Sequence, residues 1–337
     1  MKKLKIFICC PGSWSAGLNS PERGEGRWAQ NWAKMLGAAG HTVTACSAGY
    51  PPQRNAHPGV TLVGEHERIV DGPYDIYIDT AWWEVKVPKT TSRFYFRVHW
   101  GLESFLLKPG LPENHCIIYP YESTGKINFK GDHNPYTDRT FWMPVPLRAS
   151  MAEPAFNRKD ILIPAHASPA VSNNPANAKI AVDKIYSYLE KGYDFRCHWL
   201  FGEQLRVQPY AEAARNSPPN TVFHSRMEYN KVVDIIDQCR LTVQLNSCSC
   251  AVDSVVAGVP FVAWETGGFF TEIAAECGIL IGSNEETKER IEEVIDILMT
   301  NEEVYTRYVL KLQEFLYGHT EDTAIEIFND ILEKMGI

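Results

Sequence analysis

The sequence lacks the features that carry a chain into or across a membrane. No basic segment precedes a long apolar run, and the apolar stretch Ile6–Cys10 is far too short to span a bilayer. We therefore expect neither a signal peptide nor a transmembrane segment. Ile6–Cys10 is better explained as a first buried β-strand.

The nine cysteines have spacings that predict neither a metal site nor a disulfide framework. Their number is odd, and no Cys-x-x-Cys pair or Cys/His cluster has the spacing of zinc ligands. Cys9 and Cys10 are adjacent, Cys248 and Cys250 lie two apart, and we expect both pairs to be buried thiols. This usage favours a reducing, cytoplasmic location.

The net charge of −8 conceals an uneven distribution. Residues 1–150 contain 17 Lys and Arg against 13 Asp and Glu, a net +4, whereas the remainder contains 16 against 28, a net −12. A positive first half could attract an anionic acceptor, such as a phospholipid headgroup, a phosphorylated glycan or a nucleic acid. An ordinary solvated surface is the simpler alternative.

The chain is long enough, at 337 residues, for two domains. Short apolar runs alternate with helical patterns, which predicts parallel α/β architecture. Strands are expected in the first half at residues 5–10, 41–47, 61–63, 75–79, 93–99 and 116–119. Residues 121–140 are expected to form a loop, and 26–39 a helix that buries Trp28, Trp32, Met35 and Leu36 on one face.

A segment without clear periodicity, residues 144–159, marks the expected change of domain. Beyond it, strands are expected at 160–164, 195–201, 221–224, 241–245, 259–263 and 278–281. Helices are expected at 177–191, 229–238, 285–299, 302–316 and 320–335. The second half therefore repeats the parallel α/β pattern of the first.

The stretch from Asp253 to Gly268 is the most informative part of the chain. It predicts a carboxylate that opens a short helix, a glycine that ends the helix, a buried strand and a Gly-Gly turn, with Glu272 four residues further on. Backbone N–H groups at helix N-termini suit phosphates, and a carboxylate suits ribose hydroxyls. This combination predicts a site for a nucleotide that carries a diphosphate.

The segment resembles the donor-nucleotide signature of retaining GT-B glycosyltransferases, especially family 4. The matching positions are Asp253, Gly258, Pro260, Gly267, Gly268 and Glu272. The opening of the chain is also similar, with a glycine-rich loop, a helix and then Gly40-His41-Thr42-Val43 before a second strand. A third match is Phe96–Gly101, a strand that ends in His-x-Gly at His99.

The resemblance implies a GT-B fold, an α/β architecture in which two Rossmann-like domains with parallel sheets face each other across a cleft. Residues 1–150 would bind the acceptor, 151–317 would bind the nucleotide sugar, and 318–337 would form a helix that returns to the first domain. The sequence has no Asp-x-Asp motif, with which a GT-A enzyme would hold its metal. We therefore expect metal-independent transfer without a cofactor, in which positive side chains and backbone dipoles replace the metal.

The resemblance also implies roles for individual residues. His99, Lys179 and Glu272 would be catalytic. The donor would be bound by Gly17, His166, Lys179, Arg226, Asp253, Gly267, Gly268, Phe269, Phe270, Thr271 and Glu272. The acceptor would contact Trp82, Trp83 and His99, since exposed aromatic rings near a cleft commonly stack on sugars or bases.

Each of these roles has a structural alternative. Asp253 could be a simple helix N-cap, Thr271 could cap the helix after a plain turn, and Lys179 could be an exposed helix lysine. His99 could be a satisfied structural histidine, and Trp82 and Trp83 could be core residues.

The sequence departs from the family pattern at two places. Leu245 stands where the family has its first glutamate, with an apparent deletion through Asn246–Cys250, and no arginine stands near His166. Asn246, Ser247 or Ser249 could supply hydrogen bonds to the sugar instead. These departures leave open a non-catalytic nucleotide-sugar-binding scaffold.

The predicted function is transfer of a sugar from a nucleotide sugar, with a UDP-sugar as the expected donor, to a hydroxyl acceptor with retention. The acceptor is undetermined between a glycan, a lipid headgroup, a small molecule and a modified nucleic acid. One specific alternative is glycosylation of a modified base in phage-type DNA. An epimerase or phosphorylase of the same fold is a further alternative.

Overall fold

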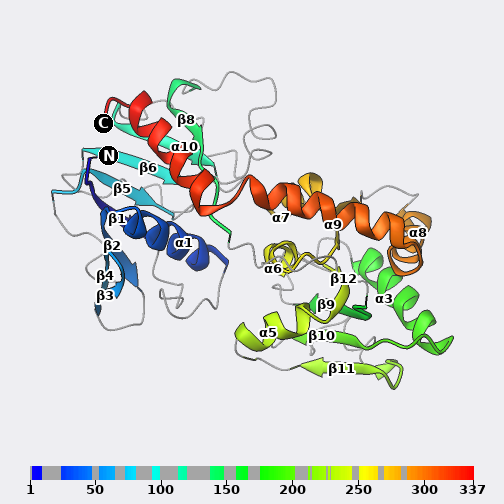
Figure 1. Ribbon diagram of the computed structural model, residues 1–337. Coiled ribbons are helices and arrows are strands. Elements are labelled where there is room, and N and C mark those ends of the chain that lie inside the picture. The colour runs from blue at the N-terminus through cyan, green and yellow to red at the C-terminus, as the bar shows by residue number, and fades with distance from the viewer. Residues whose placement is uncertain are drawn as a thin grey trace. The chain divides into compact units, whose positions relative to one another are not determined.

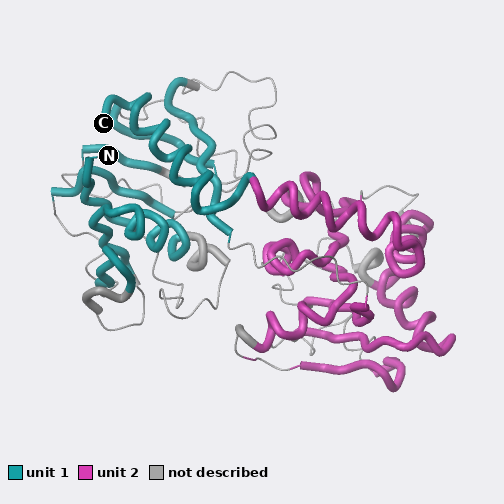
Figure 2. The backbone as a smooth tube through the Cα atoms, viewed as in Figure 1, with its two compact units in different colours: residues 1–148, 318–337 teal, residues 149–317 magenta. Residues whose placement is uncertain are grey.

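The computed structural model describes two compact units, residues 1–148 with 318–337, and residues 149–317 (Figure 2). The described residues are 2–9, 24–47, 53–64, 73–80, 93–98, 113–119, 137–147, 157–165, 175–201, 212, 215–224, 227, 229–244, 250–264, 269–281 and 287–337. Unit 2 is one continuous segment, whereas unit 1 combines two segments of the chain. We describe each unit by itself.

Unit 1 is built on one eight-stranded sheet in the order β3-β4-β2-β1-β5-β6-β7-β8 (Figure 1). The strands are β1 (Lys5–Cys9), β2 (Thr42–Ser47), β3 (Gln53–His57), β4 (Val60–Gly64), β5 (Ile76–Asp79), β6 (Phe94–Val98), β7 (His115–Tyr119) and β8 (Thr140–Trp142). Every pairing is parallel except that of β3 with β4. All strands but β3 therefore end at one carboxyl edge.

Helix α1 (Gly24–Ala38) packs on this sheet through the predicted apolar stripe. Trp32, Met35 and Leu36 are buried, as expected, and the indole Nε1 of Trp32 donates to the carbonyl of Pro144 at 2.9 Å. Gly37 allows close packing, since a Cβ there would lie 2.3 Å from the carbonyl oxygen of Pro58. The side chain of Trp28 lies outside the described residues.

The last helix, α10 (Glu321–Lys334), belongs to unit 1 although it follows unit 2 in the sequence. Thr320 caps it, with Oγ1 accepting from the backbone N–H of Thr323 at 3.1 Å. Its buried Phe328 lies edge-on to Phe96 of β6 and to His41, with ring centroids 6.2 and 5.9 Å apart. The final helix thus completes the core of the first sheet.

Unit 2 is built on a six-stranded, all-parallel sheet in the order β11-β10-β9-β12-β13-β14. The strands are β9 (Asp160–Ala165), β10 (Cys197–Phe201), β11 (Thr221–His224), β12 (Cys239–Val243), β13 (Phe261–Trp264) and β14 (Ile279–Ile281). The helices are α3 (Pro175–Glu190), α5 (Tyr229–Ile236), α6 (Cys250–Val256), α7 (Phe269–Glu276), α8 (Thr287–Thr300) and α9 (Glu302–Tyr317). Counted within the unit, the strand order is 3-2-1-4-5-6, that of a dinucleotide-binding Rossmann sheet.

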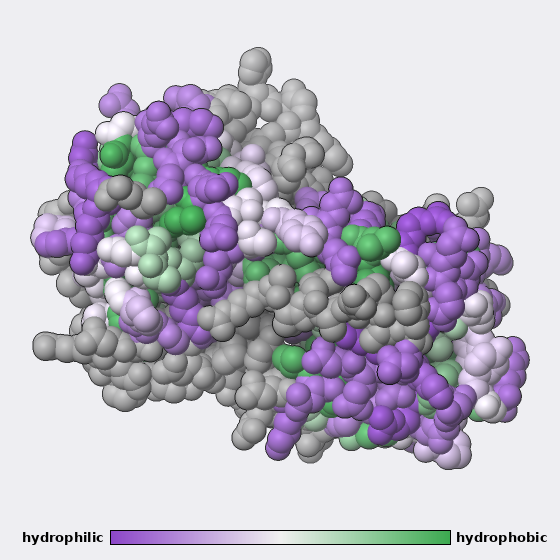
Figure 3. Space-filling view, in the orientation of Figure 1, coloured by the Kyte–Doolittle hydropathy of each residue, from purple (hydrophilic) through white to green (hydrophobic). Residues whose placement is uncertain are grey.

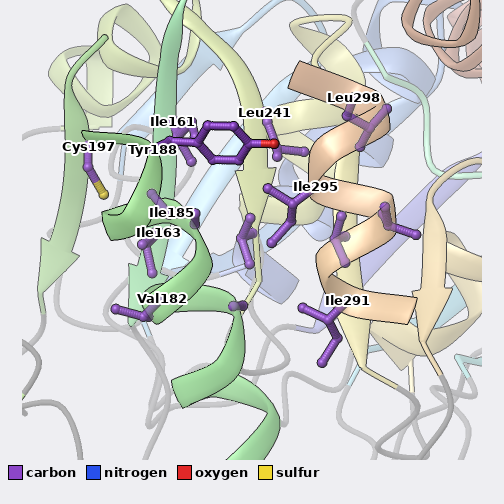
Figure 4. Packing of buried hydrophobic residues seen from close by; sticks show 14 of the residues in the cluster. Ile161, Ile163, Val182, Ile185, Tyr188, Cys197, Leu241, Ile291, Ile295 and Leu298 are labelled. Atoms are coloured by element: carbon purple, nitrogen blue, oxygen red, sulfur yellow. The ribbon is translucent and has the colours of Figure 1, made fainter. Parts of the chain in front are cut away.

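Side chains that alternate along the strands supply two cores, one on each face of the second sheet. Ile161 and Ile163 face α3 and α8, where Ile185 and Ile295 meet them (Figure 4). Trp199 belongs to the same cluster. Leu162 and Leu200 face the opposite way, toward α5 and α6. A one-residue register slip would move each set to the opposite face, away from the helices against which it packs.

The structure corrects several boundaries. It contains β3, whose sequence Gln-Arg-Asn-Ala-His has no apolar alternation, and β8, which begins at Thr140 where the loop was expected to end. Helix α6 begins at Cys250 rather than at Asp253. An edge strand such as β3 obtains its hydrogen bonds from one neighbour and does not need a buried face, which explains why the sequence pattern missed it.

In the described part of the chain, no helix is both long and apolar enough to cross a membrane. The face seen in Figure 3 is mainly hydrophilic, with green areas that are small and separate. No group of three or more His, Cys, Asp or Glu among the described residues could hold a metal ion.

Candidate nucleotide site at the carboxyl edge of the second sheet

The strand order of unit 2 identifies the edge at which a ligand would bind. From β9 the chain winds outward through β10 to β11, and from β12 it winds the other way through β13 to β14, so β9 and β12 flank the switch point. In open parallel sheets, ligands bind outside the carboxyl ends of the strands at this point. The connections that follow β9, β12 and β13 are therefore the candidate site.

Asp253 lies in the first turn of α6, directly after the connection that follows β12. Its exposure is 6% of the maximum, so the carboxylate is nearly buried. The helix begins three residues earlier at Cys250, and Asp253 is therefore not the N-cap residue. The N-cap explanation of this position is wrong, while its role toward a ribose remains a prediction.

A buried hydroxyl pair fixes α6 to β12. Ser254 Oγ lies 3.0 Å from Thr242 Oγ1 and 2.7 Å from the carbonyl oxygen of Cys250, and both hydroxyl side chains are fully buried. Gly258, with φ of 65°, ends the helix in the left-handed conformation, as the sequence predicted. The first turn of α6 is thus held at a fixed height beside the end of β12.

The connection from β13 leads into α7, whose first turn is formed by residues 269–272. Thr271 lies inside this helix, so the suggestion that it caps the helix is wrong. The far end of α7 packs closely on β13, because a Cβ at Gly278 would lie 2.6 Å from the Phe261 ring. The backbone N–H groups in the first turn of α7 therefore lie at the same edge of the sheet as the first turn of α6.

Helix N-termini thus converge on neighbouring strand ends. α7 follows β13, α6 follows β12, and α6 and α7 contact each other, while the sixteen-residue helix α3 follows β9. The positive ends of helix dipoles and their unpaired N–H groups stabilise anions. The helix N-termini at this edge could therefore bind an anionic group, and the buried Asp253 lies in the first turn of one of these helices.

Lys179, predicted as a phosphate ligand, lies in the second turn of α3. Its Nζ is 2.6 Å from Asp183 Oδ2 in an i,i+4 ion pair, with both side chains 60% exposed. The hydrogen bond to Asp183 raises the pKa of Lys179, so the lysine is cationic at neutral pH. A phosphate would have to compete with this carboxylate, and the role of Lys179 remains a prediction.

The remaining predicted site residues lie outside the described residues or have undescribed side chains. Outside them lie Gly17, Trp82, Trp83, His99, His166, Arg226, Gly267 and Gly268. Phe269, Phe270, Thr271 and Glu272 are placed by their helix only. Their roles stay predictions, although Trp82 and His99 follow β5 and β6, two adjacent strands of unit 1.

Two features were missed by the sequence reasoning. Asp79 and Thr80 end β5 at the carboxyl edge of the first sheet and are buried, at 7% and 1% exposure. The available signal in the sequence was a carboxylate, Asp79, at the end of an otherwise apolar strand. The second feature joins Asp160, His198 and His224 across three strands, and no local pattern could have indicated it.

Comparison with solved structures identifies the fold. The chain is similar to sucrose-phosphate synthase from Thermosynechococcus elongatus, with TM-score 0.65, 11% identity, and 99% of this chain and 100% of that chain covered. It is similar to WaaG, a glycosyltransferase involved in lipopolysaccharide biosynthesis, with TM-score 0.63, 13% identity, and 96% and 99% coverage. It is also similar to Anabaena HepE in complex with UDP and glucose, with TM-score 0.61, 11% identity, and 99% coverage of both chains.

The sequence itself matches no protein-family model and no curated protein sequence. At these identities the structural likeness shows the fold alone. The expectation of an α/β, two-domain GT-B architecture is confirmed, and the chain has the fold of the GT-B glycosyltransferases.

Proposed function

We propose that this protein is a glycosyltransferase that binds a nucleotide-sugar donor, a UDP-sugar, at the carboxyl edge of the second sheet. The observation that carries the proposal is the β12-α6-β13-α7 unit, in which Asp253 is buried in the first turn of α6 and α6 contacts α7. This unit contains the donor-like sequence pattern. The chain shares its fold with Anabaena HepE, whose structure was solved in complex with UDP and glucose.

In this proposal the groups of the site have separate tasks. The Asp253 carboxylate accepts hydrogen bonds from the ribose hydroxyls, and the helix N-termini bind the diphosphate. Lys179, His166 and Arg226 stabilise the negative charge that builds on the departing diphosphate. The Gly267–Gly268 turn and residues 269–272 approach the sugar, with Glu272 contacting one of its hydroxyls.

Unit 1 would supply the acceptor side. His99 and the ring pair Trp82 and Trp83 follow strands β6 and β5 and would contact the acceptor. Transfer with retention would follow a front-face path in which the departing phosphate oxygen takes the acceptor proton. No protein nucleophile is then needed, and cationic side chains and helix dipoles carry out the task of a metal.

A binding experiment tests the donor site. UDP, GDP, ADP and CDP are titrated by calorimetry into wild type, Asp253→Asn and the matched control Asp234→Asn, an exposed carboxylate on α5. Loss of hydrogen bonds to a charged group costs about 1.5–3 kcal/mol, so the affinity for the accepted nucleotide should fall roughly 10- to 150-fold in Asp253→Asn only. Equal binding by all three proteins would remove Asp253 from the site.

A turnover experiment separates the enzyme from the alternatives. The UDP-sugar that binds best is incubated with candidate glycan, lipid, small-molecule and modified-DNA acceptors, and a sample without acceptor is run beside them. A glycosylated product with retained configuration supports the transferase. An isomerised sugar without acceptor indicates an epimerase, and tight binding without any turnover indicates a scaffold.

A further inference from the structure

A charged side chain from outside helix α6 holds the end of that helix. Nη1 of Arg158 donates to the carbonyl oxygen of Ala257 at 2.8 Å, and Ala257 directly follows the last residue of α6. The backbone N–H of Ala257 in turn donates to the carbonyl oxygen of Asp253 at 2.9 Å. A cation at a helix C-terminus also interacts favourably with the helix dipole. Ala257 therefore connects the guanidinium group of Arg158 to the helical turn that carries Asp253.

Helix α6 depends on such contacts for its position, because it has only seven residues. Isolated helices shorter than about 12–15 residues are marginal in water, so tertiary contacts determine where a short helix lies. The hydroxyl of Ser254 ties the side of α6 to Thr242 of β12. Arg158 ties the C-terminal end of the helix, away from the carboxyl edge of the sheet. Together the two contacts fix where the first turn of α6, with Asp253, comes to lie.

Arg158 belongs to a part of the chain that is distant from α6 in the sequence. It lies two residues before β9, in the segment through which the chain enters unit 2, and 99 residues before Ala257. The side chain of Arg158 is partly exposed, whereas Ala257 is buried at 7% exposure. A guanidinium group only donates hydrogen bonds, and a helix C-terminus offers carbonyl acceptors. The position of the entry segment is thereby coupled to the position of α6.

We propose that Arg158 is a positioning residue of the donor site, which holds the Asp253 side chain in place for the ribose through the backbone of α6. Groups that recognise a ligand by hydrogen bonds must be held within about 0.5 Å of their productive geometry by the residues around them. Arg158 contacts the opposite end of α6 from the first turn, so it acts through the helix and not on the nucleotide. This inference rests on the proposed function, because it concerns the residue that would bind the ribose.

Arg240 offers a matched control, because it holds the end of another helix in the same unit. Its Nε donates to the carbonyl oxygen of Leu298, in the last turn of α8, at 2.9 Å, and its Nη2 lies 2.9 Å from Glu302 Oε1. Burial raises the pKa of Tyr305 on α9, and the charges of Arg158 and Arg240 both oppose this rise, so the two guanidinium groups lie near the same residue. Helix α8 carries none of the predicted donor residues.

The first experiment compares stability with nucleotide affinity. Wild type, Arg158→Met, Arg158→Lys and Arg240→Met are titrated by calorimetry with UDP, or with whichever of GDP, ADP and CDP wild type binds best. Both methionine variants should lower the Tm by at least about 2–4 °C, since each removes a charge-assisted bond at a helix end. Only Arg158→Met should weaken nucleotide binding, roughly tenfold, as is typical when a partner behind a ligand-binding group is lost. Arg158→Lys keeps a cation for the single carbonyl and should bind nearly as well as wild type.

A double-mutant cycle determines whether Arg158 acts through Asp253. Arg158→Met should weaken binding roughly tenfold in wild type but little in the Asp253→Asn protein, where the group that Arg158 positions has already been altered. A residue that affects the fold in general, or that contacts the nucleotide directly, would weaken binding by the same factor in both backgrounds. If Arg158→Met does not fold, Arg158→Gln replaces it in both experiments, because glutamine keeps an amide donor on a shorter side chain.

The outcomes separate the inference from the function on which it rests. If Arg158→Met resembles Arg240→Met, with a lower Tm and unchanged affinity, Arg158 is a structural residue and the donor site stands. Equal weakening in the two backgrounds of the cycle also overturns the inference and leaves the donor site intact. If wild type binds none of the four nucleotides, the proposed function and the inference fall together.

Discussion

Both units are built on sheets of mainly parallel strands, but they differ in how the chain completes them. Unit 2 is one continuous stretch, residues 149–317, and its sheet is parallel throughout. Unit 1 combines residues 1–148 with 318–337, and its sheet ends in the antiparallel strand β3. The core of unit 2 therefore comes from one segment, whereas the core of unit 1 needs α10, which follows unit 2 in the sequence.

The buried histidines also differ between the units. In unit 1, His41 accepts through Nδ1 from the backbone N–H of Leu4 at 3.3 Å, and its ring lies edge-on to Phe328. In unit 2, Nε2 of His198 lies 3.0 Å from Oδ2 of Asp160, and its Nδ1 lies 2.9 Å from Nε2 of His224. One histidine packs within a core, and the other links strands β9, β10 and β11 through its side chain.

The largest expected effect tests whether the two units are stabilised independently of each other. Trp32→Ala in unit 1 and Trp199→Ala in unit 2 each remove a fully buried indole and should cost about 3–5 kcal/mol of unfolding free energy. Denaturant unfolding with and without UDP measures both. UDP should still stabilise the Trp32→Ala protein through unit 2. Loss of UDP binding in Trp32→Ala would mean that the donor site depends on unit 1.

The next effect concerns the hydroxyl pair that fixes α6. Ser254→Ala leaves the buried hydroxyl of Thr242 without its partner and should cost about 1–3 kcal/mol, with weaker UDP binding. The double variant Ser254→Ala with Thr242→Val removes both groups and should recover part of the loss. Calorimetry and denaturant unfolding complete the double-mutant cycle, and strictly additive costs would contradict coupling between the two hydroxyls.

A smaller effect should appear as acid sensitivity of unit 1. Burial lowers the pKa of His41, so the folded protein resists a proton that the unfolded chain binds below pH 6.5. Stability should therefore be full above pH 6.5 and decline as the pH falls below it. His41→Asn, which keeps an acceptor for Leu4 but cannot titrate, should show a flatter profile in unfolding measured across this range. An equally steep decline would place the acid sensitivity elsewhere.

The smallest expected stability effect is at the exposed pair of Lys179 and Asp183. Breaking it with Asp183→Asn should change the unfolding free energy by no more than about 0.5 kcal/mol. The same substitution frees Lys179 for a phosphate, so UDP should bind equally well or tighter, whereas Lys179→Met should weaken UDP binding. Unchanged affinity in Lys179→Met would assign the lysine to the exposed helix surface alone.

The sequence correctly predicted those strands and helices whose burial pattern is visible in a short segment. Short apolar runs predicted β1, β9 and β13, and the stripe of Trp32, Met35 and Leu36 predicted the buried face of α1. Asp253 was located in the correct helix by a short pattern, although the small residues before it concealed where the helix begins. These features are local and therefore visible in the sequence.

Other features depend on pairing between distant segments. Strand β3 is polar and exists because β4 offers it hydrogen bonds in an antiparallel edge position. Asp160 and His198 are 38 residues apart in the sequence, and His198 and His224 are 26 apart. These side chains meet only after three strands align. Physical proximity of this kind has no signature in a single sequence.

The return of α10 to unit 1 sets the order in which the protein can be completed during synthesis. The chain begins unit 1, leaves it at residue 148, builds all of unit 2, and only then supplies Phe328 to the first core. Unit 2 is continuous, so it can fold on the ribosome as soon as residue 317 has emerged. Unit 1 must wait, with the faces of His41 and Phe96 uncovered, until the helix that follows unit 2 has been made. The first domain to be started is the last to be finished, and a chaperone that shields its open core in the interval would raise the yield of native protein.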